Sequence, residues 1–281
     1  MTSHIKNPLP ADETPDTKGG MSKAPLDALK TRHRSVNLWI QRILGHVMGR
    51  GGSGYRVRTA INKQYRGVVL DGPFAGMKYE ARPGGNVPKM VGCYELELHP
   101  VIEKIVARQY ASIVNVGCAE GYYAVGLAMR SPASRVYAYD IDAESRRLCE
   151  KLAVENECGE RVCVRGRCDA GELVNVLTAR PALVFCDCEG FELELLDPRQ
   201  APALKQCDIL VELHDNFVPG LSEKLLPRFA ATHEIEKTRS VPRRAGLRPE
   251  LAMLSDRDQA RALGEGRLGV MEWAWLRAKG E

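Results

Sequence analysis

Short apolar runs alternate with amphipathic stretches along the second half of this chain. The runs are rich in Val, Ile and Leu and only four or five residues long, which predicts buried strands rather than helices. In chain order they cover residues 113–116, 135–139, 162–165, 183–186 and 209–213. Helical patterns at residues 146–155 and 172–178 lie between strands. Strands that alternate with helices predict an α/β fold with a mostly parallel sheet.

Two more strands are predicted near the C-terminus, at residues 234–237 and 270–276. Residues 239–267 form an insertion between them, with a short helix from Asp256. A Ser255-x-x-Asp258 pattern predicts the start of that helix. We expect the insertion to overhang the mouth of a substrate site.

A glycine-containing turn joins the first predicted strand to its helix. Gly117 and Gly121 bracket this turn, and residues 124–128 continue as an apolar helix. Glycine lets the backbone turn tightly and approach a ligand closely. Asp140 ends the next strand, about 20 residues further on, where doubly wound folds bind the ribose hydroxyls of an adenosine. This order predicts an adenosine-cofactor site, and a plain tight turn is the alternative.

The glycine pattern indicates which adenosine cofactor binds. A dinucleotide needs G-x-G-x-x-G, so that its pyrophosphate can approach the backbone and the helix N-terminus. Here Ala119 occupies the second glycine position, and Glu120 places a negative charge where a phosphate would be repelled. S-adenosylmethionine has an adenosine, a cationic sulfonium and an amino-acid tail, but no phosphate. It is therefore the expected cofactor.

Three segments carry a resemblance to a known family: residues 114–121, 139–142 and 186–193. In the last of these, Asp187-x-Glu189-Gly-x-Glu192 has the order of an element that follows the fourth strand in FkbM-type enzymes. The chain thus resembles class I S-adenosylmethionine-dependent methyltransferases, nearest to the FkbM type, over about residues 90–215. The resemblance implies a doubly wound, mostly parallel seven-stranded sheet completed by a C-terminal antiparallel hairpin, with an N-terminal helical and hairpin extension.

The turn and the resemblance together give the expected cofactor-binding residues. These are Asn115, Gly117, Cys118, Glu120, Gly121, Asp140, Ile141 and Asp169. Asn115 departs from the family pattern, because many class I enzymes carry an acid there, near the cofactor's amino group. Asp169 follows the third strand, where the family meets the adenine edge. An N-cap for the next helix explains Asp169 equally well.

The catalytic candidates follow the fourth and fifth strands. Parallel strands bring their carboxyl ends to one edge of the sheet, where ligands bind. Asp187 and Glu189 should therefore lie beside His214 and Asp215. His214 is the expected general base, since its ordinary pKa lies near neutrality, and Asp187 would orient it or face the substrate. Two alternatives stay open: a polar turn at residues 214–216, and a Mg²⁺ site built from the same oxygens and imidazole.

These features predict an O-methyltransferase that acts on a small-molecule or glycan hydroxyl. The sulfonium methyl is already activated, so the protein has to position the nucleophile and remove a proton. One alternative is an RNA methyltransferase that uses the basic N-terminal region, although the Asn/Asp-Pro-Pro-Tyr element of amino-directed enzymes is absent. The other is a non-catalytic module that keeps the cofactor site and has lost the transfer.

Charge is unevenly distributed along the 281 residues, whose formal net charge is +4. Residues 1–70 contain twelve basic and four acidic residues, so the remainder is mildly acidic. We expect a disordered tail over residues 1–24, a basic amphipathic helix and a hairpin lid over 25–90, and the methyltransferase domain over 91–281. The helix at residues 26–49 is expected to pack on its own domain or on a second subunit. A membrane surface or a nucleic acid is the alternative partner.

The sequence contains no apolar run long enough to cross a membrane, and no secretory signal is visible at the N-terminus. Nine cysteines, an odd number, are scattered through the predicted elements, which favours reduced thiols and a cytoplasmic location. Cys186 and Cys188 flank Asp187, but a C-x-C spacing without a second pair argues against zinc. No residue is therefore assigned as a metal ligand.

Overall fold

The computed structural model describes residues 67–79, 87–267 and 269–280. All of them belong to one compact unit that spans residues 44–281. The tail expected at residues 1–24 and the amphipathic helix expected at 26–49 lie outside the described residues. In the part of the chain that is described, every helix is too short or too polar to cross a lipid bilayer.

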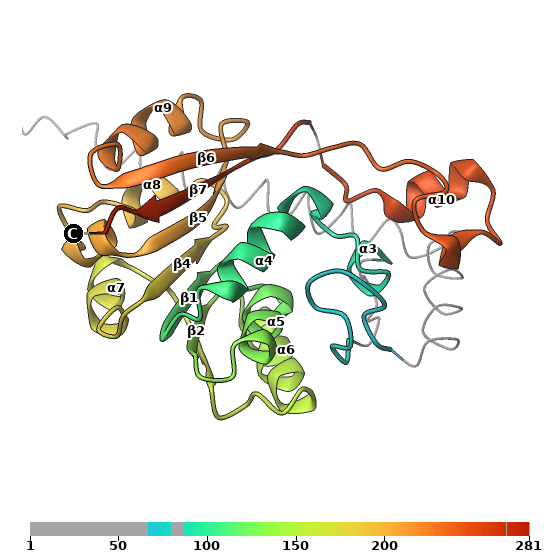
Figure 1. The fold of residues 1–281 in the computed structure, drawn as a ribbon, viewed down its shortest axis with the longest axis horizontal. Coiled ribbons are helices and arrows are strands. Elements are labelled where there is room, and N and C mark those ends of the chain that lie inside the picture. Colours follow the sequence, from blue (N-terminus) through green and yellow to red (C-terminus); the bar gives the residue numbers. More distant parts are fainter. Residues whose placement is uncertain (1–66, 80–86, 268, 281) are drawn as a thin grey trace, which may run out of the picture. The chain divides into compact units, whose positions relative to one another are not determined.

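A seven-stranded sheet forms the centre of the fold (Figure 1). The strands are β1 (Ser112–Val116), β2 (Arg135–Tyr139), β3 (Val162–Arg165), β4 (Ala182–Cys186), β5 (Asp208–Leu213), β6 (His233–Arg239) and β7 (Glu272–Ala278). They lie in the order β3-β2-β1-β4-β5-β7-β6, and β7 runs antiparallel to both of its neighbours. The four other pairings are parallel. The expected doubly wound, mostly parallel sheet with a C-terminal antiparallel hairpin is confirmed.

Helices connect the strands and cover both faces of the sheet. The α-helices are α3 (Val87–Met90), α4 (His99–Ala107), α5 (Tyr122–Arg130), α6 (Ala143–Glu155), α7 (Ala170–Val176), α8 (Glu192–Leu195), α9 (Leu221–Leu225) and α10 (Asp256–Leu263). The 3-10 turns are η2 (Leu96–Leu98), η3 (Pro202–Gln206), η4 (Leu226–Arg228) and η5 (Pro249–Leu251). Helices α4, α5 and α6 pack on one face, whereas α7, α8 and α9 pack on the other. Crossover helices on both faces bury both faces of the parallel strands.

Side chains alternate between the two cores along the central strands. Ile113 of β1 belongs to the core under α4 and α5, and its neighbour Val114 belongs to the core under α7 and α9. All residues of β1, β4 and β5 are buried. The apolar runs are continuous for this reason, because a strand covered on both faces needs apolar residues at both parities.

Two aspartates set helix starts earlier than expected. The carboxylate of Asp142 accepts a hydrogen bond from Ser145 N at 2.7 Å and caps α6, which begins at Ala143 rather than at residue 146. Asp169 accepts from Glu172 N at 3.0 Å and caps α7, which begins at Ala170 rather than at residue 172. Each cap satisfies an amide of the first turn that has no intrahelical partner.

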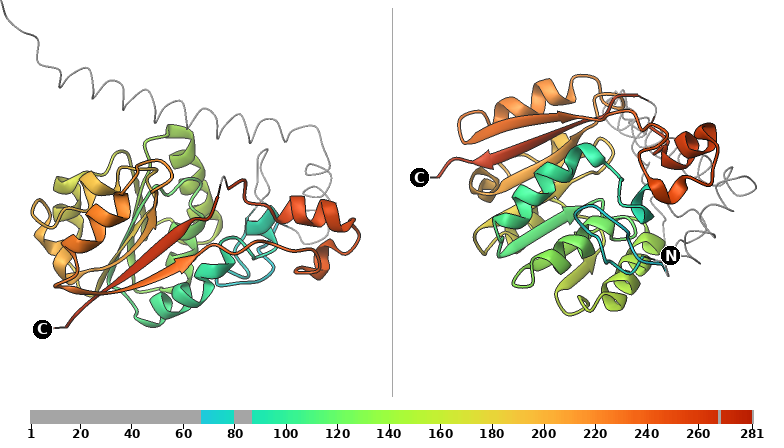
Figure 2. Two further views of the ribbon diagram at one scale, coloured as in Figure 1. Left: turned by 90° about the horizontal axis from the view of Figure 1, so that it is seen from above. Right: turned by 45° about the vertical axis from the view of Figure 1, so that its right-hand side comes forward.

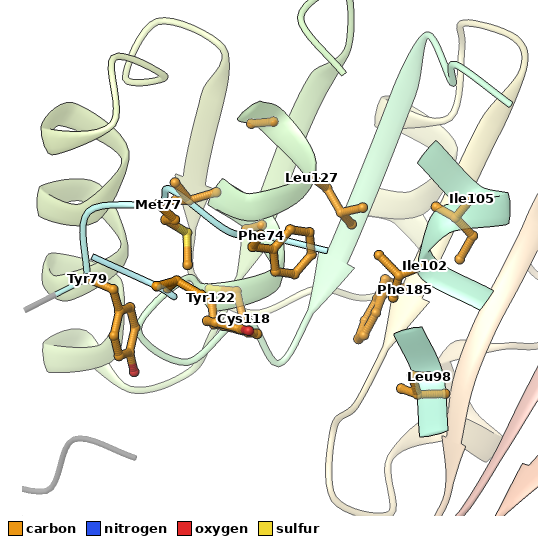
Figure 3. Close-up of a cluster of buried hydrophobic side chains, with 14 of the residues drawn as sticks. Phe74, Met77, Tyr79, Leu98, Ile102, Ile105, Cys118, Tyr122, Leu127 and Phe185 are labelled. Carbon is orange, nitrogen blue, oxygen red and sulfur yellow. The ribbon is translucent and has the colours of Figure 1, made fainter. Parts of the chain in front are cut away.

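Residues 67–79 form a loop with one antiparallel bridge, between Val68 and Lys78, instead of the two strands of the expected hairpin. Phe74 of this loop lies edge-on to Tyr122 of α5, with ring centroids 5.2 Å apart (Figure 3). Phe74, Met77 and Met90 are buried in the core that α4 and α5 share. The described residues of the expected lid thus contribute buried side chains to a core that they share with residues 91–281.

The insertion between β6 and β7, residues 240–271, is called the arm below. It contains η5 and α10, and α10 packs next to α3 (Figure 2). One buried and one partly exposed ion pair connect the arm to the segment that precedes β1. Arg243 contacts Glu97 at 2.7 Å, and Arg248 contacts Asp71 at 2.6 Å. These contacts hold the arm against α3 and the segment that precedes β1.

Among the described glycines, Gly117 is the one at which an added Cβ atom would make the shortest contact. Its φ is +79°, and a Cβ atom there would lie 1.7 Å from the carbonyl oxygen of Asp187. Gly117→Ala should lower the free energy of unfolding by about 2–5 kcal/mol, from the left-handed backbone penalty plus overpacking. Urea unfolding measures the loss. Gly166→Ala is the control, because a Cβ at Gly166 meets no atom within 4 Å. Equal effects of the two substitutions would contradict the prediction.

Candidate active site

The candidate site lies at the carboxyl ends of the central strands. β1 stands between β2 and β4, so the chain leaves β1 toward one side of the sheet and returns on the other. In open α/β sheets such a switch point forms a crevice in which ligands bind. The glycine turn follows β1, Asp140 follows β2, and Asp187 and His214 follow β4 and β5. The sheet order therefore brings all four expected groups to one edge.

The glycine turn is held against two neighbouring strand ends. The amides of Gly117 and Cys118 both donate to Tyr139 O at 2.9 Å. Gly121, with a φ of +97°, packs against Cys149 of α6, whose Sγ would lie 2.7 Å from an added Cβ. Ala119 adopts a φ of 47°, which is uncommon for a residue other than glycine. The backbone of the turn is thus fixed before any ligand binds.

The carboxylate of Asp140 is hydrogen-bonded to this turn. Its Oδ2 accepts a hydrogen bond from Ala119 N at 2.9 Å, and its Oδ1 accepts from Asp142 N at 2.8 Å. Burial raises the pKa of Asp140 above its ordinary value. The next side chain, Ile141, is 79% exposed, although it is large and apolar. A carboxylate and an open apolar side chain therefore stand together beside the turn.

Two of the expected cofactor residues point away from the open side of the turn. The Cys118 side chain is buried, and hydrogen bonding with Cys149 together with burial raises the pKa of its thiol. Asn115 is 1% exposed, and its Nδ2 donates to Phe185 O at 3.4 Å. Its Oδ1 has no hydrogen-bond partner among the described residues. Cys118 can therefore offer a ligand only its backbone, whereas Asn115 keeps one buried acceptor.

Asp169 combines the two roles that the sequence leaves open. Its carboxylate caps α7, and its side chain is exposed. It also lines a pocket of about 280 Å³. The pocket wall includes Phe191, and the guanidinium of Arg167 lies 5.1 Å from the Phe191 ring centroid. A cap for α7 and a wall for a planar ligand are thus compatible.

His214 is buried and lies at the centre of a group of four acids. The ring is 1% exposed, and its Nδ1 lies 2.7 Å from Glu192 Oε1. Its Nε2 faces Asp187, Glu189 and Glu212 at 3.5, 3.6 and 3.7 Å. The sequence expectation that Asp187 and Glu189 lie beside His214 therefore agrees with the observed positions.

Glu192 fixes the orientation of the imidazole. It is fully buried, and its Oε1 also accepts a hydrogen bond from Cys188 N at 3.1 Å. A carboxylate can only accept, so the Nδ1 of His214 carries the proton in this contact. Phe217 stacks on the ring, with centroids 5.4 Å apart and planes 18° apart. The Nε2 of His214 is thereby directed toward the three acids at the sheet edge.

Glu212 lies in the site, although the sequence analysis did not identify it as a site residue. It is 4% exposed, and burial and the nearby Asp187 raise its pKa well above the ordinary value. It sits within the apolar run that predicts β5, where a strand assignment gives no reason to single it out. Its strand parity is the signal that could have found it, since residues two apart share a face. Glu212 and His214 are such a pair.

Glu95, in the segment before β1, is a further buried acid close to Asp187 and Glu212. Its backbone has a φ of 46°, its side chain is buried, and the hydroxyl of Tyr123 donates to its Oε2. Arg267 of the arm lies 3.1 Å from its Oε1. Burial raises the pKa of Glu95 to about 7, although Arg267 opposes the shift. The arm thus reaches the site, as expected for the insertion, through a charge contact that no local sequence pattern indicates.

Asp215 is the one expected catalytic residue that the structure places elsewhere. Its Oδ1 accepts a hydrogen bond from Ser222 N at 3.1 Å, in the first turn of α9. The side chain stabilises that helix start instead of facing the acids around His214. We therefore leave Asp215 out of the site.

Three of these groups have the geometry of a metal site. Asp187, Glu212 and His214 each offer one ligand atom, and these atoms all lie within 4.8 Å of one another. The donor set of two carboxylates and one imidazole fits Mn²⁺, Fe²⁺ or Zn²⁺ better than Mg²⁺, which prefers oxygen ligands. The residues present therefore fit a divalent ion, but not the Mg²⁺ alternative in its usual form.

Comparisons with known proteins give structural likeness alone. No protein-family model and no curated protein matches the chain. Among solved structures, it is similar to the O-methyltransferase TomG from Streptomyces achromogenes, in complex with SAM, at 13% identity and a TM-score of 0.45 over 82% of this chain and 91% of the other. It is also similar to an O-methyltransferase from Bacillus cereus in complex with SAH, at 13% identity and a TM-score of 0.44 over 85% and 97%. Values this low establish neither family nor function, which have to come from the site.

The raised pKa of Glu95 predicts how stability depends on pH. Between about pH 4.5 and 7 the unfolded chain releases this proton while the folded chain keeps it, so the free energy of unfolding falls as the pH rises. Glu95→Gln should remove this component, on the order of 2–3 kcal/mol between pH 5 and pH 8. Urea unfolding across that range measures it. Glu157→Gln, at a side chain that is 90% exposed, is the control. A difference between Glu95→Gln and wild type that stays constant with pH would contradict the assignment.

Proposed function

We propose that this protein is an S-adenosylmethionine-dependent methyltransferase that methylates a hydroxyl of a small molecule or glycan. The observation that carries the proposal is the buried His214, held on Nδ1 by Glu192, at the sheet edge that also holds the glycine turn and Asp140. A base with one fixed nitrogen beside an adenosine-type turn suits methyl transfer to a group that has to lose a proton.

The residues around the turn suit the cofactor in distinct ways. Asp140 would accept hydrogen bonds from the ribose hydroxyls, in exchange for its present contact with Ala119 N. Ile141 would lose its exposed apolar surface against the adenine ring. Asp169, at the mouth of the neighbouring pocket, would accept a hydrogen bond from the adenine amino group. Gly117 and Gly121 leave the turn without side chains that would obstruct the ligand.

The catalytic step needs little from the protein beyond position and a base. S-adenosylmethionine, when bound, supplies a methyl group that is already activated as a sulfonium. His214 Nε2 would take the proton of the acceptor hydroxyl, whose oxygen would receive the methyl group, with S-adenosylhomocysteine as the other product. Glu192 stabilises the imidazolium that results, and the proton then leaves to solvent. Asp187 and Glu189 lie where they would accept hydrogen bonds from the acceptor.

The charge of the site favours this acceptor class over nucleic acid. Four acids, Asp187, Glu189, Glu192 and Glu212, lie within 3.7 Å of the ring nitrogens of His214. A phosphate backbone would be repelled by such a surface, whereas a polyhydroxylated acceptor finds many hydrogen-bond acceptors. The basic region before residue 67 lies outside the described residues, so RNA methylation has no support from the site.

A divalent ion is the second candidate feature, because Asp187, Glu212 and His214 fit one. Such an ion would polarise the acceptor oxygen and lower the pKa of its hydroxyl. His214 would then be a ligand and not the base. Binding of Mn²⁺ to the purified protein, observed by electron paramagnetic resonance, distinguishes the two roles.

Asp140→Ala should weaken binding of S-adenosylhomocysteine by about ten- to a hundredfold, because charge-assisted hydrogen bonds to the ribose are lost. Isothermal titration calorimetry measures the change. Asp256→Ala removes the same charge at an exposed position of the arm and serves as the control. Unchanged affinity in Asp140→Ala, or no binding by the wild-type protein, would refute the cofactor assignment.

His214→Ala should keep its affinity for S-adenosylhomocysteine and slow methyl transfer by about 10²- to 10⁴-fold, since the placed base is lost. Mass spectrometry of products from a panel of hydroxylated acceptors measures the rate. Asp215→Ala should retain transfer, because the carboxylate of Asp215 caps α9. Unchanged turnover in His214→Ala removes it from the mechanism. Cofactor binding by the wild type without product from any acceptor favours a non-catalytic module.

A further inference from the structure

An ion pair stands beside the glycine turn, and the chemistry above does not use it. Lys89 Nζ lies 2.5 Å from Glu120 Oε1, and the hydroxyl of Tyr79 donates to the same oxygen at 2.7 Å. The Lys89 and Glu120 side chains are only 11% and 23% exposed. Lys89 comes from α3 and Glu120 from the turn between β1 and α5, so tertiary structure has to bring the two charges together.

Glu120 favours its charged form in this pair. Burial raises the pKa of Glu120, but the ammonium of Lys89 and the hydroxyl of Tyr79 outweigh it and hold the pKa below the ordinary value. Lys89 Nζ also lies 4.7 Å from the ring centroid of Tyr94 and 5.3 Å from that of Tyr122. These electron-rich ring faces attract the lysine ammonium and help to hold it beside Glu120.

Stability alone is a poor explanation for this pair. Removing two charges from water costs about as much as their attraction returns, so a buried ion pair contributes little net stability compared with apolar side chains. The pair also stands at the rim of the turn that the proposed cofactor occupies, where apolar packing would be simple to provide. Two opposite charges held side by side there suit a ligand that carries both signs.

The start of α5 adds a second site for negative charge. Its N-cap is Gly121, which has no side chain to cap the helix. The amides of the first turn therefore point toward the glycine turn, where the helix end carries partial positive charge. Glu120 directly precedes this N-cap, and Lys89 is bonded to it. A carboxylate at this position would meet Lys89 and the helix amides, and an ammonium would meet Glu120.

We propose that Lys89 and Glu120 bind the amino-acid end of S-adenosylmethionine: Lys89 takes its carboxylate and Glu120 its ammonium. This inference rests on the proposed function. The ligand's two charges enter beside the pair and extend it into a four-charge arrangement of alternating sign. A lysine ammonium has three donors, so Lys89 can hold Glu120 and a ligand carboxylate together. Asn115, the neutral residue two positions before the turn, supplies no charge for either group.

Two stable ligands test the proposal by calorimetry on the full-length protein. S-adenosylhomocysteine has the amino-acid end, and 5′-methylthioadenosine has the same adenosine and sulfur without it. Lys89→Met should weaken binding of S-adenosylhomocysteine by about ten- to a hundredfold and leave binding of 5′-methylthioadenosine unchanged. The double variant Lys89→Met/Glu120→Gln leaves no stranded buried charge, and should bind the two ligands almost equally.

Lys78→Met is the matched control, since it removes the same charge from a side chain that is 62% exposed. It should preserve the wild-type preference for S-adenosylhomocysteine. A preference that survives in the double variant overturns the proposal, and so do equal losses for both ligands. If the wild-type protein binds neither ligand, the proposed function itself fails. If it binds S-adenosylhomocysteine and only the role of the pair is wrong, the wild-type and double-variant preferences coincide.

Discussion

The close approach between Gly117 and the backbone of Asp187 is the constraint on which the site depends. An added Cβ at Gly117 would lie 1.7 Å from Asp187 O, and Asp187 N in turn donates to Val116 O at 2.9 Å. The same turn receives the carbonyl of Tyr139 from β2. Three strand ends are therefore joined within one small volume, so the adenosine-type turn and the acids of the catalytic side cannot move independently.

The second constraint is electrostatic. Several carboxyl groups are buried close together, and the charge of each is compensated in a different way. Glu192 is paired with His214 and Glu95 with Arg267, while burial and the nearby Asp187 raise the pKa of Glu212. A group of acids that crowd one another in this way is typical of functional sites, where charge is arranged for a ligand at some expense of stability. The buried cations of the arm supply part of the compensation, which explains why the arm carries its arginines on the side of the segment before β1.

The strands of the sheet could be predicted from the sequence because the patterns that indicate them are local. Apolar runs covered on both faces, helix periodicity and the glycine turn each leave a pattern within a few residues. The helix starts were missed by two or three residues, because the capping role of Asp142 was not considered and that of Asp169 was left as an alternative to cofactor binding. The site divides in the same way. Asp187, Glu189 and His214 follow strand ends and could be placed by topology, whereas Glu95 and Arg267 meet only through a contact across most of the chain. Lys89 and Glu120 were not paired for the same reason.

The contact between Glu95 and Arg267 has a consequence for biosynthesis. During translation, Glu95 emerges from the ribosome long before Arg267, so its carboxylate cannot be buried in compensated form until the arm has been made. The contact that covers Glu95 can therefore form only after nearly all of the arm has been made, shortly before β7 itself is synthesised. Cofactor binding to the glycine turn needs only earlier segments. The nascent protein can thus acquire its adenosine pocket well before it has a complete place for an acceptor.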